Sequence, residues 1–104
     1  MIYATSKDMD ITGTSLMGYI NTTYDRLLEV FGEPTHYDSS DGKVTAEWDI
    51  EFIDDDGDVH KATVYDWKQY DLGTPHATYD WHVGGISGSG VLGMVQDAVW
   101  GDAL

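Results

Sequence analysis

Strict alternation of apolar and polar side chains over residues 44–52 is the feature that most constrains the fold of this chain. The run reads Val44, Thr45, Ala46, Glu47, Trp48, Asp49, Ile50, Glu51 and Phe52. Successive side chains of a strand point to opposite faces of its sheet, so a period of two indicates a half-buried strand. One face of this strand must therefore pack against a core, and its acids lie on the other face.

The alternating segment leads into a turn and a second strand, which together predict a hairpin. The turn is the acidic run 54–58, and the chain returns over residues 59–68. If Ile53 pairs with Val59, Glu51 lies opposite Lys61 and forms a favourable cross-strand charge pair. The same register predicts three further neighbours: Ile50 with Ala62, Trp48 with Val64, and, also on the inner face, Ala46 with Asp66.

Residues 23–31 are predicted to form a helix. Their apolar residues recur at helical spacing, at Tyr24, Leu27, Leu28 and Phe31. With Thr22 as N-cap, Asp25 falls at the third helical position, which is a variant of the capping box. Gly32 suits the left-handed position after the helix, and Pro34 blocks its continuation.

Weaker patterns complete the fold. Residues 15–20 and 77–83 read as strands, and Ser87 or Ser89 is expected to cap a last helix over 91–99. Three consecutive antiparallel strands with helices on one face give an α+β two-layer sandwich. We expect a three- to four-stranded antiparallel meander with two helices, in a single domain over residues 1–104.

The chain is strongly acidic, with 19 Asp and Glu against 5 Lys and Arg and a formal net charge of −14. Such a field repels nucleic acid and anionic membranes and attracts basic surfaces. Its 4 Trp and 7 Tyr argue against a disordered acidic tail. Because it has no cysteine and no long apolar run, we expect a cytoplasmic protein of the host cell. Adaptation to high salt is an alternative source of this composition.

Motifs for chemistry are weak, so we expect no catalytic residue, no cofactor and no metal. The acidic run 54–58 fails as an EF-hand, because its loop would begin at Phe52, which is not a ligand. The glycine-rich run 84–90 precedes a helix but matches no phosphate-binding fingerprint. Metal or acid–base candidates, equally readable as structural residues, are His60, His76, His82, Asp66 and Asp80.

The outer face of the predicted hairpin combines acids with large aromatics. In the register above, Glu47 and Asp49 lie across from Tyr65 and Trp67. Aromatic anchors beside steering carboxylates suit an interface for a basic protein. The alternative is that a second layer, such as the C-terminal helix, covers this face.

Four segments together resemble small, largely uncharacterised proteins encoded by bacteriophages. They are FGEPT at 31–35, KVTAEWDIEF at 43–52, ATVYDWK at 62–68 and WHVGG at 81–85. The likeness implies a phage or prophage origin and no established activity, although small acidic phage proteins often resemble inhibitors of host defence. A weaker likeness is to outer-membrane assembly lipoproteins and beta-lactamase inhibitor proteins. The chain lacks the cysteines of those families, so only the architecture carries over.

Charge and resemblance together predict a non-enzymatic inhibitor of host defence, of the anti-CRISPR kind. Its partner would be a basic host protein that handles nucleic acid, such as a nuclease, and its acids would mimic a DNA backbone. The expected partner-binding residues are Glu47, Asp49, Glu51, Asp54, Asp55, Asp56, Asp58, Tyr65 and Trp67.

Two alternatives stay open at this point. A small nucleotide-like ligand would be held by Asp66, Lys68, Asp80, His82, Gly84 and Gly85. A salt-adapted structural protein would need no partner at all. In each case we expect no direct contact with nucleic acid or membrane, and a monomer or a dimer.

Overall fold

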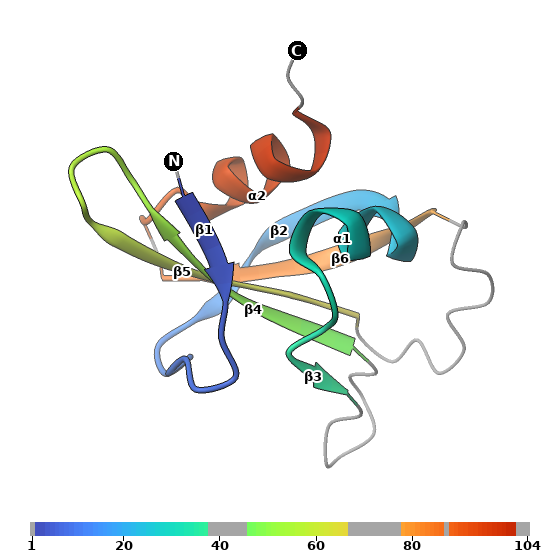
Figure 1. Ribbon diagram of the computed structural model, residues 1–104, viewed down its shortest axis with the longest axis horizontal. Coiled ribbons are helices and arrows are strands. Elements are labelled where there is room, and N and C mark those ends of the chain that lie inside the picture. Colours follow the sequence, from blue (N-terminus) through green and yellow to red (C-terminus); the bar gives the residue numbers. More distant parts are fainter. Residues whose placement is uncertain (1, 38–45, 67–77, 87, 102–104) are drawn as a thin grey trace.

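One antiparallel sheet carries two helices on the same face (Figure 1). The computed structural model describes residues 2–37, 46–66, 78–86 and 88–101. The elements are β1 (Ile2–Thr5), β2 (Ser15–Thr23), α1 (Tyr24–Phe31), β3 (His36–Tyr37), β4 (Ala46–Ile53), β5 (Val59–Tyr65), β6 (Thr78–Gly85) and α2 (Val91–Trp100). The strand order is β1-β4-β5-β6-β2, with β3 also paired to β4. The predicted α+β class is confirmed.

The predicted hairpin register between β4 and β5 is confirmed. Ile53 lies opposite Val59 and Glu51 opposite Lys61. The same ladder pairs Trp48 with Val64. Asp66 also lies where the pattern places it, because its Oδ1 accepts the Ala46 N–H at 2.8 Å.

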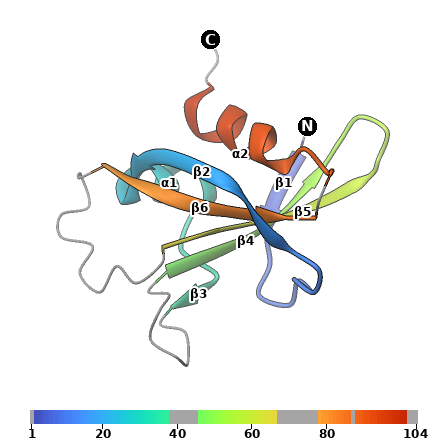
Figure 2. The ribbon, with the colours of Figure 1, turned by 180° about the vertical axis from the view of Figure 1, so that it is seen from behind.

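The sheet is larger than the predicted meander because short strands join its edges. β1 pairs with residues 50–53 of β4, and β3 pairs with residues 46 and 47 on the same edge. β2 is longer than expected and pairs with β6 along the opposite edge, as Figure 2 shows from behind. These pairings are distant in sequence, and strands of four and two residues carry too little alternation to be recognised.

Both helices form, but their N-caps differ from the predicted residues. Thr23, not Thr22, caps α1, because its hydroxyl accepts the Arg26 N–H at 3.0 Å. Asp25 therefore lies one position too early for the capping-box variant. α2 begins after Gly90 with no side-chain cap, so Ser89 does not have the predicted role, and Ser87 lies outside the described residues. At the end of α1, Gly32 has a φ of 81°, a region that favours glycine.

The core lies between the helices and the inner face of the sheet, with Trp48 at its centre. The Trp48 ring meets the Trp81 ring edge-on at 5.6 Å and the Tyr24 ring at 5.7 Å. Its indole N–H donates to the Gly32 carbonyl oxygen at 2.9 Å, which ties β4 to the end of α1. From α2 come the buried residues Val91, Val95 and Val99.

Several sequence predictions lie outside the described residues. They concern the turn at 38–42, the first two residues of the alternating run at 44 and 45, and the side chains of Trp67, Lys68 and His76.

We expect Trp48→Ala to lower the free energy of unfolding by about 3–5 kcal/mol, because it removes a buried ring and leaves a cavity. Trp100→Ala is the matched control, since Trp100 is 55% exposed, and we expect a loss of about 1 kcal/mol or less. Urea unfolding followed by circular dichroism measures both. Equal losses would show that Trp48 is not the centre of the core.

Candidate functional site

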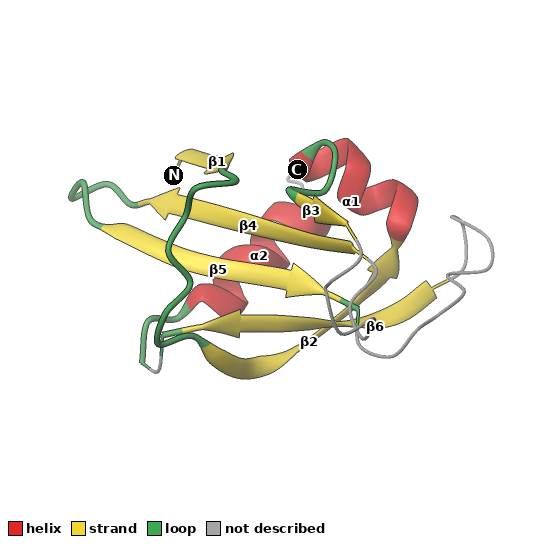
Figure 3. Ribbon diagram, turned by 90° about the horizontal axis from the view of Figure 1, so that it is seen from below, coloured by secondary structure: helices red, strands yellow, loops and turns green. Residues whose placement is uncertain are grey.

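The sheet face opposite the helices is covered by the loop 6–14, which joins β1 to β2. Figure 3 shows this connection crossing β4 and β5. The Ser6 N–H donates to the Asp49 carbonyl oxygen at 3.1 Å, and the Lys61 ammonium donates to the Asp10 carbonyl oxygen at 3.2 Å. The cover is this loop and not the C-terminal helix. Asp49 is only 1% exposed, so the prediction that it faces a protein partner is wrong.

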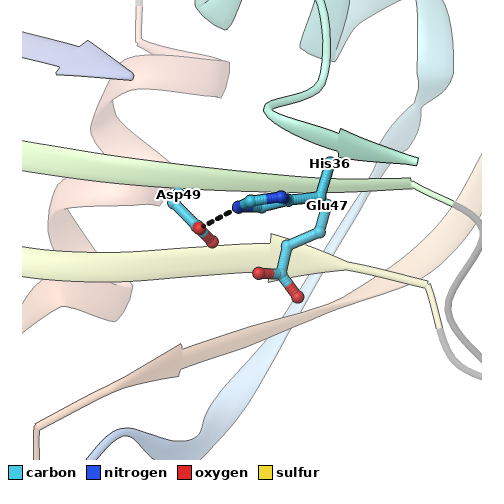
Figure 4. Close-up of side chains that lie close together, drawn as sticks. All are labelled: His36, Glu47 and Asp49. Atoms are coloured by element: carbon cyan, nitrogen blue, oxygen red, sulfur yellow. Dashed lines mark hydrogen bonds and ion pairs between the residues drawn. The ribbon is translucent and has the colours of Figure 1, made fainter. Parts of the chain in front are cut away.

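On this face of the sheet, the side chains of His36, Glu47 and Asp49 form one cluster, shown in Figure 4. His36 lies directly opposite Glu47 in the β3–β4 pairing, and Asp49 is two residues further along the same face of β4. The His36 Nε2 atom lies 2.9 Å from Asp49 Oδ2. One ligand atom from each of the three side chains lies within 4.8 Å of the other two.

Thr35 holds the cluster in place. Its hydroxyl donates to the Glu47 carbonyl oxygen at 2.9 Å and accepts the Asp49 N–H at 2.8 Å. This one side chain therefore bonds to the backbone of both acidic positions, immediately before the strand that carries His36. The alternation of β4 orients the acids, and Thr35 brings the histidine to them.

The carboxyl groups of Glu47 and Asp49 lie close enough to affect each other's protonation. Burial raises the pKa of Glu47 to about 8, and the hydrogen bond and negative charge of Asp49 act in the same direction. The Asp49 Oδ1 atom is buried and meets no N–H or hydroxyl donor in the described part of the chain. Two carboxylates this close are held together by a shared proton or by a cation.

A cavity of about 230 Å³ adjoins Glu47. Its wall is formed by Ile11, Thr14, Ser15, Glu47, Thr63, Tyr65 and Gly84. At Gly84 any side chain would intrude, since a Cβ there would lie 2.5 Å from the Thr63 hydroxyl. None of the described residues in this wall is basic, so the cavity suits a neutral or cationic group better than a phosphate.

Tyr65 lies opposite Glu47 as predicted, but it is not a free aromatic anchor. Its ring stacks on the His82 ring, with the ring centres 5.2 Å apart. The Tyr19 ring meets the same His82 ring edge-on at 5.0 Å. Burial raises the pKa of the Tyr65 hydroxyl and lowers that of the His82 imidazole. Tyr65 therefore contributes to the packing of the outer face.

The acidic turn of the β4–β5 hairpin is organised around Asp54. Its Oδ1 accepts the N–H groups of Asp56 and Asp58, each at 2.9 Å, and its Oδ2 lies 2.8 Å from His60 Nε2. The bond to His60 lowers the pKa of Asp54, and the backbone donors add to this effect. Asp54 is thus a structural part of the turn, whereas Asp55, Asp56 and Asp58 are exposed.

Next to this turn lies a row of exposed apolar side chains. Ile2, Ile53 and Val59 lie side by side across three strands in the register of the sheet. They are 68%, 38% and 52% exposed, respectively. The three apolar residues and the acids Asp55, Asp56 and Asp58 form one surface, which we call the hairpin tip.

The described residues among those predicted for a nucleotide-like ligand do not form one site. Asp66 is buried against the Ala46 backbone, whereas Asp80 is exposed and accepts a bond from the Asn21 amide at 2.8 Å. Gly84 lines the cavity, but Gly85 faces the core, where a Cβ would overlap the Val91 side chain. Asp80 and His82 do lie on one face, as predicted, but they have different partners.

Comparison with family models, with curated proteins and with solved structures finds no match to this chain. Within the described residues, neither helix is long and apolar enough to cross a membrane.

Sequence reasoning did not identify His36 or Thr35 as site residues. The chain separates them from Glu47 by more than ten positions, and they reach it only through the two-residue strand β3. The alternation at 44–52 did predict that Glu47 and Asp49 share a face. No pattern in residues 6–14 indicated that a loop would cover them.

We expect the stability of the metal-free protein to depend on Glu47 ionisation. Its folded pKa of about 8 exceeds the ordinary value of 4.5, so protonated Glu47 favours folding below pH 4.5 and this contribution is lost as the pH rises through 8. Glu47→Gln cannot ionise, so the variant should gain stability relative to the wild type between pH 5 and 9. Urea unfolding in EDTA at several pH values measures the difference, and parallel curves would contradict it.

Proposed function

We propose that the protein is a non-enzymatic inhibitor that binds a basic, nucleic-acid-handling host protein through the hairpin tip. The observation that carries the proposal is the contiguous apolar row of Ile2, Ile53 and Val59 beside three exposed acids. Apolar side chains supply the desolvated centre of an interface, and the acids supply steering and pairing at its rim.

The proposed surface is narrower than the one expected from the sequence. Asp49 is buried, Tyr65 packs on His82 and Asp54 is bonded within the turn. Glu51 faces Lys61 across the hairpin. The exposed acids that remain lie at the end of the β4–β5 hairpin, which projects from the body of the sheet in Figure 1. A projecting acidic hairpin suits insertion into a groove that otherwise holds a nucleic-acid backbone.

The formal charge of −14 supports this choice of partner. A field of this size accelerates encounter with a cationic surface, and the acceleration falls as salt is added. It also opposes self-association through acidic surfaces, so the partner is a different protein of opposite charge.

The experiment is a binding and inhibition assay against a panel of purified host nucleases and DNA-binding proteins. We expect at least one basic protein of the panel to bind this chain at 50 mM salt and to bind it more weakly at 500 mM. The affinity of that protein for DNA should fall when this chain is bound to it. The triple variant Asp55→Asn/Asp56→Asn/Asp58→Asn should bind more weakly and show a shallower salt dependence.

The matched control removes the same number of charges elsewhere, with Asp8→Asn/Glu29→Gln/Asp97→Asn. All three of these acids are exposed and lie outside the β4–β5 hairpin. The control should retain most of the affinity. If both triple variants lost the same affinity, the hairpin tip would not be the binding surface. If the affinity did not change with salt, electrostatic steering would be ruled out.

A second candidate, a small-molecule binder, is favoured by the cavity beside Glu47. Its volume of about 230 Å³ is small for a ligand pocket, and its wall favours a neutral or cationic molecule over a nucleotide. Thermal melting with a panel of nucleotides and small cations distinguishes the two functions, because only an occupied site raises the melting temperature. A salt-adapted structural protein would instead gain folding stability from salt alone.

A further inference from the structure

In the His36–Glu47–Asp49 cluster, the buried carboxyl group of Asp49 has few hydrogen-bond donors around it. The Asp49 side chain is 2% exposed, and only one of its two oxygens, Oδ2, has a partner, the His36 ring. The other oxygen is buried and has no hydrogen-bond partner among the described residues. The Glu47 carboxyl group lies in the same cluster. A buried carboxylate oxygen next to a second carboxyl group is stabilised either by a proton shared between the two groups or by a cation that takes the place of that proton.

We infer that His36, Glu47 and Asp49 form a binding site for a divalent first-row transition cation. Each residue offers one ligand atom, and the three atoms lie within 4.8 Å of one another. Tetrahedral ligands on bonds of about 2.0 Å are separated by roughly 3.3 Å. The 2.9 Å contact between His36 Nε2 and Asp49 Oδ2 therefore needs only a small opening to admit an ion.

The ligand types select the class of ion. One imidazole nitrogen and two carboxylate oxygens, with no thiolate, suit Zn²⁺ or Mn²⁺. Ca²⁺ and Mg²⁺ prefer oxygen ligands alone and would gain little from His36. The His36 side chain is 48% exposed, so an ion can enter from solvent past this ring.

Three protein ligands leave coordination positions open, as in zinc sites that bind water or substrate. Glu47 belongs both to the cluster and to the wall of the adjoining cavity. The open positions would therefore face a space of about 230 Å³ bounded by Thr63 and Tyr65. Thr35 acts as a positioning residue, because its hydroxyl fixes the β4 backbone at both acidic ligands.

The acidic turn is the competing location for an ion. Asp54, Asp56 and Asp58 also bring carboxylate oxygens within 4.8 Å of one another. These groups are exposed or partly exposed, and Asp54 already accepts two backbone N–H groups and faces His60. The turn therefore has no buried carboxylate oxygen without a donor, unlike Asp49, and its residues supply the matched control.

The test is a calorimetric titration of the metal-free full-length chain with Zn²⁺ at fixed pH. We expect one saturable site, with affinity at least about 10-fold weaker in His36→Gln and in Glu47→Gln. The controls His60→Gln and Asp54→Asn should bind as the wild type does. Failure of the wild type to bind, or weakening by the controls and not by His36→Gln, would overturn the inference.

A second measurement uses the wild type alone and so does not depend on the folding of variants. Substoichiometric Mn²⁺ broadens the amide signals of residues near the bound ion. We expect broadening at 35–37 and 47–49, and little effect of excess Ca²⁺ on it. Broadening centred on 54–58, or its full reversal by equimolar Ca²⁺, would place the ion in the turn and overturn the inference.

Discussion

The two-sided character of β4 is the constraint on which the rest of the structure depends. Trp48, Ile50 and Phe52 point to the helices and are fully buried, while Glu47 and Asp49 point to the opposite face. A shift of one residue in the pairing with β5 would place carboxylates in the core and the indole of Trp48 under the loop. The register therefore fixes the core and the candidate site in the same step.

Alternation predicted the hairpin well because it is a local signal on a strand with one buried face. The pairings of Ile53 with Val59 and of Trp48 with Val64 follow from it directly. β1 and β3 could not be predicted in this way, since short edge strands gain their stability from a partner that is distant in sequence. The cap at Thr23 was missed by one position because adjacent threonines offer the same hydroxyl.

The candidate site was predictable only in part, for the same physical reason. Alternation placed Glu47 and Asp49 on one face, but whether that face meets water depends on what covers it. Asp49 is buried on this face, where the loop 6–14 bonds to its backbone, whereas Asp55, Asp56 and Asp58 are exposed at the hairpin tip. His36 joins the cluster through tertiary pairing that no spacing in the chain records. Composition could give the total charge, but only the fold could divide it between a buried cluster and a surface.

The different coverings of the two sheet faces have a consequence for how the sequence can vary. On the helix side, interlocked apolar side chains such as Trp48 and Trp81 tolerate little change in volume. On the loop side, the covering segment is attached to the sheet by a few polar contacts, such as the bond from Ser6 to Asp49. Residues of the outer layer can therefore be exchanged with little disturbance of the core. Because the sheet separates the two layers, residues that bind a partner or ligand on the loop side can change while the fold stays the same.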